Sequence, residues 1–274
     1  IRFNDNHLIN YKNGCLSLMN FALYKGKENI VVNGDMSSRP DDKLTVTFKN
    51  LDIADFNPIL QKFGLNLQGK MNDNVVLRSV FKDMTLTSNV TIDDLVINDV
   101  KLGKAKFGFN NMLSKNEFAA DIRMSYNEPN SGQIIPLSIK GRVNLTDKND
   151  NLDLKVDMQE FDIRIIENYL SSLSSYVRGK ISTENLLVKG KFTQPHIEGS
   201  LKIKDGAMKI DMLNTTYSFN DELFVNDNVF TMDNFVLQDA QKNKITINGT
   251  ITHDNFTNFD LNLKAKVDKI KVLD

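Results

Sequence analysis

The stretch LKIKDGAMKIDM, residues 201–212, alternates apolar and polar side chains on both sides of an Asp205-Gly206 pair. Alternation with a period of two is typical of a β-strand that buries one face and exposes the other. An Asp-Gly pair between two such runs favours a hairpin turn, because both residues tolerate the backbone angles that tight turns require. The stretch therefore predicts two antiparallel strands joined at Asp205-Gly206.

The same alternation covers most of the chain. Clusters of Asn, Asp and Gly separate the apolar runs, as at residues 147–150 and 253–255, and they predict further turns. We therefore expect an almost all-β protein. The clearest runs are Leu44-Val46-Phe48, Leu152-Leu154-Val156-Met158, Ile245-Ile247 and Leu261-Leu263-Ala265-Val267.

Composition excludes several classes of protein. The 34 Lys and Arg residues balance 35 Asp and Glu residues, so the basic excess that nucleic-acid binding needs is missing. No stretch approaches the roughly 20 apolar residues of a membrane-spanning helix. The sequence opens at Ile1 inside an alternating run, which indicates a piece of a longer protein whose export signal would lie upstream.

The residue types that carry chemistry are sparse. His7, His196 and His253 are far apart in sequence and lack metal-ligand spacing, and Cys15 has no neighbouring His with which to form a nucleophile. Nucleophile elbows, phosphate-binding loops and dinucleotide-binding loops are absent from the sequence. We expect neither an enzyme nor a bound metal or cofactor.

Two stretches have helical spacing instead. Residues 56–63 begin near Pro58, a residue that the first turn of a helix tolerates. In the second stretch one face of a longer helix is formed by Ile165, Ile166, Tyr169, Leu170 and Leu173. A glycine follows each stretch, and we interpret the second one, Gly179, as part of a strand.

These helices belong to an internal repeat. Leu51-Asp52-Ile53 recurs as Phe161-Asp162-Ile163, and residues 67–70 recur as residues 177–180. A third, partial copy is indicated by Val267, Ile270 and Val272. The period is about 110 residues. We therefore expect one elongated β segment over residues 1–274, with a first unit over about 1–160 and a second over about 161–274.

So many half-apolar strands must cover their apolar faces. Either a second sheet packs on them, or the sheet curls into a trough whose lining stays open for a ligand. Periodicity alone favours an ordinary core. An open trough would be lined by aliphatic side chains that suit flexible acyl chains, namely Val90, Ile92, Leu154, Val156, Leu201, Ile203, Ile210, Leu237, Ile245, Ile247, Leu261, Leu263 and Val267.

Residues 179–206 contain glycine, proline and turn residues in a distinctive order. A strand with Gly179 is followed by a strand with Gly190, a connection at Pro195, a strand with Gly199 and then Asp205-Gly206. In this order the chain resembles the C-terminal region of the TamB family of cell-envelope proteins, most closely over residues 161–272. The first copy lacks the proline joint. The resemblance is moderately specific, because each element alone is common in β-proteins.

The resemblance implies a long curled antiparallel sheet that forms an open apolar trough, known as a β-taco, with one or two short helices. It also implies a periplasmic segment of a protein anchored in the inner membrane, related to AsmA-like bridges. Such a protein partners an outer-membrane barrel of the TamA type, shields phospholipid acyl chains during transport between the two membranes and supports outer-membrane protein assembly.

Two further interpretations remain open. The chain is a scaffold that pairs client strands at its sheet edges, or it is a structural surface protein with a closed β core.

Overall fold

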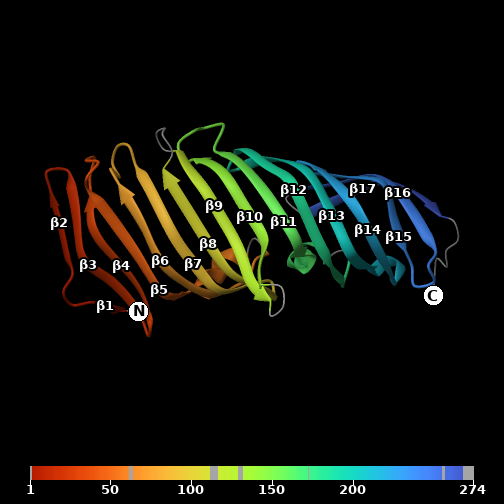
Figure 1. Ribbon diagram of the computed structural model, residues 1–274, viewed down its shortest axis with the longest axis horizontal. Coiled ribbons are helices and arrows are strands. Elements are labelled where there is room, and N and C mark those ends of the chain that lie inside the picture. Colours follow the sequence, from red (N-terminus) through yellow and green to blue (C-terminus); the bar gives the residue numbers. More distant parts are fainter. Residues whose placement is uncertain are drawn as a thin grey trace. The chain divides into compact units, whose positions relative to one another are not determined.

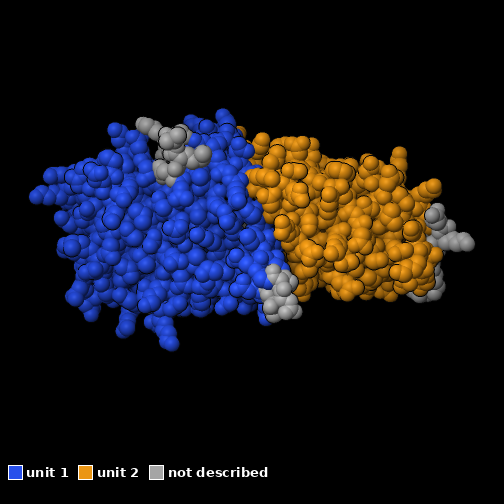
Figure 2. Space-filling model, viewed as in Figure 1, with its two compact units in different colours: residues 1–97, 101–154 blue, residues 98–100, 155–274 orange. Residues whose placement is uncertain are grey.

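The computed structural model describes residues 2–61, 64–111, 117–128, 132–171, 173–254 and 257–267. Strands account for 73% of the structure and helices for 8%, which confirms the all-β class. The chain forms two compact units, unit 1 with residues 1–97 and 101–154, and unit 2 with residues 98–100 and 155–274 (Figure 2).

The strands are long for a β-protein, and many exceed ten residues (Figure 1). In chain order they are β1 (Arg2–Phe3), β2 (Leu8–Lys12), β3 (Cys15–Lys25), β4 (Glu28–Met36), β5 (Lys43–Asp52), β6 (Leu67–Arg78), β7 (Thr85–Ile97), β8 (Val100–Asn111), β9 (Glu117–Glu128), β10 (Gly132–Asn144), β11 (Leu152–Asp162), β12 (Val177–Lys191), β13 (Gln194–Ile210), β14 (Thr215–Asn226), β15 (Val229–Gln238), β16 (Lys244–Asp254) and β17 (Thr257–Val267). The helical segments are η1 (Ile53–Phe56), α1 (Asn57–Leu60), η3 (Ile163–Leu170) and η4 (Asp211–Leu213).

The strands form one antiparallel sheet that does not close on itself, as far as the described residues show. Consecutive strands pair with each other, as hairpins in β3–β4 and β12–β13 and across a helical connection in β5–β6. The short β1 pairs with β3 beside β2. An open sheet of this kind is consistent with the curled trough that the sequence predicts.

Both predicted helices form; the first starts earlier than predicted, at Ile53, and residues 62 and 63 of its predicted end lie outside the described residues. Each begins after an aspartate that caps it, because the carboxylates of Asp52 and Asp162 accept the N–H groups of Ala54 and Arg164, both at 3.0 Å. The second helix is a 3₁₀ helix that ends at Leu170, so the prediction that it includes Leu173 is wrong. There the chain makes a turn instead, with the Leu173 N–H donating to the Leu170 carbonyl at 2.8 Å.

The prediction of a hairpin turn at Asp205-Gly206 is also wrong. Both residues lie inside β13, which runs unbroken from Gln194 to Ile210. The pairing with β14 shifts register between Ile203 and Gly206, so the pair forms a β-bulge. Asp205 adopts a φ of 51°, the left-handed conformation that the sequence pattern indicates, but it bends a strand instead of reversing the chain.

This bulge is one of five with the same construction. In each, a residue with φ between 49° and 53° donates its N–H to a side chain on the next strand, at 2.6 to 3.1 Å. We call this arrangement a bulge clasp. The donor and acceptor pairs are Asn20 with Asn33, Asn50 with Asn72, Glu160 with Ser182, Asp205 with Asn220 and Asn234 with Asn248.

The clasps satisfy a backbone group that a bulge removes from the ladder, and in the described residues they join β3 to β4, β5 to β6, β11 to β12, β13 to β14 and β15 to β16. A bulge bends its strand and increases the local twist. Repeated in strand after strand, the bulges give the sheet its curl.

Three glycines mark equivalent places in the repeat. Gly34, Gly141 and Gly249 have φ values of 115°, 149° and 139°. A Cβ atom added to any of them would overlap the backbone carbonyl of a residue on the next strand: Lys43, Asp153 or Asn262, respectively. These positions therefore require glycine for both conformation and space.

Replacing Gly141 with alanine is expected to lower the free energy of unfolding by about 3 kcal/mol, because the methyl group overlaps backbone that cannot move alone. Chemical denaturation of purified protein measures the change. Gly26→Ala is the matched control. Gly26 also has positive φ, 64°, but has open space around it, so its loss is expected to be about 1 kcal/mol. Equal losses in the two variants would contradict the close approach.

Candidate functional site

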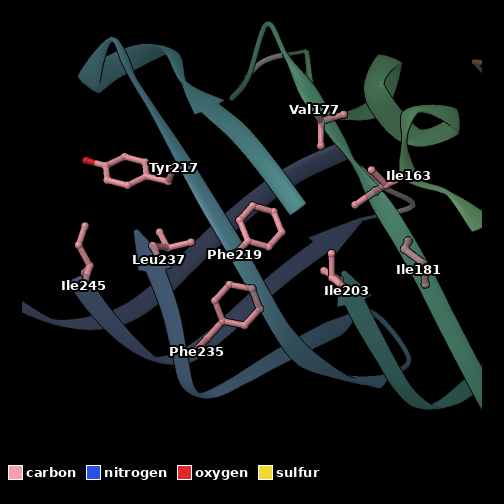
Figure 3. Close-up of a cluster of buried hydrophobic side chains, with 9 residues drawn as sticks. All are labelled: Ile163, Val177, Ile181, Ile203, Tyr217, Phe219, Phe235, Leu237 and Ile245. Atoms are coloured by element: carbon pink, nitrogen blue, oxygen red, sulfur yellow. The ribbon is translucent and has the colours of Figure 1, made fainter. Parts of the chain in front are cut away.

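Unit 2 contains a compact apolar cluster formed by consecutive strands. Its buried side chains come from the start of η3 and from β12 to β16, and they point toward one another in Figure 3. The Phe219 and Phe235 rings lie 5.5 Å apart between centroids, a separation typical of favourable aromatic pairs. The cluster consists of Ile163, Val177, Ile181, Ile203, Tyr217, Phe219, Phe235, Leu237 and Ile245.

A second set of apolar side chains packs against this cluster and keeps part of its surface in contact with solvent. We call it the apolar layer. It contains three methionines and otherwise only aliphatic residues, so its apolar contacts are adaptable. Its members are Met158, Ile166, Leu170, Leu201, Met208, Ile210, Leu213, Leu223, Met232 and Ile247.

The structure divides the thirteen predicted lining residues into three groups. Val90, Ile92, Val156, Ile203, Leu237 and Ile245 are buried by the protein itself. Leu154, Leu201, Ile210, Ile247 and Leu263 are half-buried. Leu261 and Val267, on β17, are 50% and 49% exposed.

These residues do not all lie together. Ile203, Leu237 and Ile245 belong to the unit 2 cluster, and Leu201, Ile210 and Ile247 belong to the apolar layer on it. Val90, Ile92 and Leu154 belong to unit 1. Buried residues have no surface to offer a ligand. In unit 2 the candidate site therefore consists of the apolar layer and β17, and the buried cluster supports it.

Several residues of the site do not appear among the predicted lining residues. Tyr217, Phe219 and Phe235 supply the aromatic part of the cluster, and Ile166 and Leu170 of η3 cover one side of it. The sequence contains a signal for each of them, since Tyr217-Ser218-Phe219 alternates and the apolar face of the helix includes both η3 residues.

The polar groups of unit 2 are structural. His196 Nδ1 lies 2.6 Å from a carboxylate oxygen of Asp227 in an exposed pair. Within the described residues, no group of three or more His, Cys, Asp or Glu side chains has the arrangement to hold a metal ion. None of the helices described is long and apolar enough to cross a membrane.

His253 is a titratable group whose pKa is shifted by its apolar surroundings. It is buried at the end of β16, with ring centroids 5.0 Å from Phe230 and 6.1 Å from Phe259. Burial lowers the pKa of His253 below its ordinary value, and the nearby carboxylate of Asp254 offsets only part of this effect on the pKa.

Comparison with known proteins gives no relatives: no family model, no curated protein and no solved structure matches the chain. The function must therefore be argued from the site itself.

The lowered pKa of His253 makes stability depend on pH. Above its ordinary pKa of about 6.5 the imidazole is neutral in both states; below it, the unfolded chain takes up the proton more readily, so the free energy of unfolding falls as pH decreases. Between pH 7 and pH 5 we expect His253→Phe to reduce this slope, which for one group is at most about 1.4 kcal/mol per pH unit. Urea denaturation at several pH values measures it, and an unchanged slope would contradict a buried neutral imidazole.

Proposed function

We propose that this chain is a segment of a cell-envelope bridge that shields lipid acyl chains along the apolar side of its curled sheet. The observation that supports this proposal is the apolar layer of unit 2. Its ten aliphatic and Met side chains pack against the buried cluster and keep part of their surface in solvent. Soluble proteins rarely leave contiguous apolar surface uncovered unless something binds there.

The chemistry of the layer fits an acyl chain better than a rigid or polar ligand. Burial of a methylene group is non-directional and worth about 0.8 kcal/mol, so a chain of about 16 carbons gains on the order of 10 kcal/mol before the cost of ordering it. Apolar contacts of this kind have no preferred direction and fix no single position of the lipid. An acyl chain can therefore slide along it, as transport requires, while its head group stays in water.

The cellular setting rests on the resemblance to TamB-type proteins. We propose a periplasmic location within a longer protein anchored in the inner membrane, a barrel of the TamA type as the partner in the outer membrane, and phospholipid moving between the two. The direction of movement and the lipid class are not specified by the residues of the layer.

A photo-crosslinking residue at Ile247 or Leu263 is expected to capture phospholipid from cells, because both side chains are half-buried on the apolar face. Mass spectrometry of the crosslinked adduct identifies the lipid. Lys264 is the matched control, since it neighbours Leu263 but points to the opposite, exposed face.

Lipid capture at Leu263 but not at Lys264 would support the proposal. Equal capture at both positions would indicate nonspecific contact with membranes, and no capture at either apolar position would favour a closed structural core. Ile203 is unsuitable for this test because it is buried in the cluster, where a bulky residue would disrupt packing.

A second candidate function is a scaffold for strands of client proteins, and one observation favours it. The sheet does not close on itself as far as the described residues show, so it presents edge strands. An exposed edge offers backbone hydrogen bonds that add a strand without regard to its sequence.

Proline on β17 tests the scaffold. Adjacent residues of a strand direct their N–H groups to opposite edges, so one of Lys264 and Ala265 directs its N–H away from β16, the strand with which β17 pairs. Proline there is expected to abolish capture of an unfolded barrel protein in a pull-down while lipid crosslinking at Ile247 persists. Unchanged capture would exclude the edge as the binding element.

A further inference from the structure

A histidine lies on the apolar face of β16. Residues 245 to 252 of this strand pair with β17 in unbroken register, so alternate side chains point to one face of the sheet. Ile247 and Ile251 therefore share a face, and His253 continues the same alternation. The ring contacts agree with this placement, because Phe230 pairs with Ile251 across β15 and β16 and its ring centroid lies 5.0 Å from that of His253.

The imidazole ring of His253 is packed between two neighbouring strands. Phe230 of β15 lies tilted against it, and Phe259 of β17 meets it edge to face, with 6.1 Å between the ring centroids. His253 is only 8% exposed. Its backbone N–H donates to the Asn228 carbonyl of the β14–β15 turn at 3.0 Å. This one residue thus links the start of β15, the end of β16 and the start of β17.

The carboxylates near this ring belong to three elements. Asp254 follows it on β16, and by the alternation its side chain lies on the opposite face of the sheet. Asp260 of β17 pairs with Thr252, whose side chain points to that opposite face too. Asp227 of the β14–β15 turn is bound by His196, with 2.6 Å between Nδ1 and the carboxylate oxygen. A positive charge on the ring is therefore stabilised only in part, by Asp254.

Protonation of His253 makes this end of the unit 2 sheet harder to keep closed. Aromatic and aliphatic neighbours replace only part of the hydration that an imidazolium needs. Strand ends beside a turn open more readily than the middle of a sheet, because fewer contacts have to break. Below the ordinary pKa of imidazole, about 6.5, the open form takes up the proton more readily than the closed form, so opening becomes more favourable as pH falls.

We propose that His253 is an acid-operated latch: the neutral ring holds the ends of β15, β16 and β17 together, and its protonation in mild acid opens this end of the apolar face. Opening removes the surface around Ile251 from the acyl-chain site. That consequence rests on the proposed lipid function, whereas the opening itself does not.

Hydrogen exchange of the whole chain at pH 7 and pH 5 tests the latch, with exchange times scaled for the intrinsic effect of pH on amide exchange. Between these pH values the opening constant of residues 228–232 and 249–254 is expected to rise about tenfold, because the open form binds the proton more tightly than the closed form. Residues 215–219 and 235–238 lie at the other end of β14 and β15 and are the internal reference, which is expected not to change.

Two histidine variants separate the latch from other titrating groups. His253→Phe is expected to abolish the pH-dependent opening, because a phenyl ring of similar size fills the same place without taking up a proton. His196→Asn is the matched control. It removes the exposed histidine beside Asp227 while an Asn side chain can still donate to that carboxylate, so the pH-dependent opening is expected to remain. Circular dichroism at pH 7 checks that both variants fold.

An opening constant that is equal at pH 7 and pH 5 would overturn the proposal. An equal rise at both ends of the strands would also overturn it, since this indicates global unfolding. These two outcomes are measured on the unaltered chain, so they do not depend on how a variant folds. A rise that His253→Phe leaves unchanged would assign the opening to another group.

Photo-crosslinking of the purified chain with phosphatidylcholine vesicles tests the link to the acyl-chain site. Ile251 is half-buried beside His253, and Ile247 lies further along the same face. Capture at Ile251 is expected to fall about twofold between pH 7 and pH 5, as for a strand end that is open in about a tenth of molecules at pH 7 and in about half at pH 5. Capture at Ile247 is expected to persist.

The two measurements keep the latch and the lipid function apart. Opening in hydrogen exchange without lipid capture at either position would refute the lipid function and leave the latch. Lipid capture at both positions that is independent of pH, in a chain without local opening, would refute the latch alone.

Discussion

The fold depends on how a bent strand satisfies its backbone. A bulge takes one N–H out of the ladder, and a hydrogen bond that replaces the lost one at an exposed position is worth about 0.5–1.5 kcal/mol net. Here a side chain on the next strand accepts that N–H in five separate places, four times through Asn and once through Ser182. Because each clasp joins neighbouring strands, the bends stay in line, and a line of bends curls the sheet.

The curl decides what the apolar faces can do. Side chains near the bends of unit 2 meet and form a dry cluster around Phe219 and Phe235, whereas those further along the strands, such as Leu201 and Ile247, keep some exposure. Unit 2 therefore has a filled centre that holds the fold together, with half-buried apolar side chains beside it on the same strands.

Alternation in the sequence predicts the strands, their inward faces and the all-β class, because burial of one face is a local property of the pattern. It does not predict the bulge within β13, because an Asp-Gly pair such as Asp205-Gly206 is typical of hairpin turns. A signal was present: Lys49-Asn50, Gln159-Glu160, Lys204-Asp205 and Asp233-Asn234 are pairs of polar residues that break the alternation at four of the five clasps. Exposure along a face cannot be predicted from alternation, since Ile245 and its partner Val267 share a face, yet only Ile245 is buried.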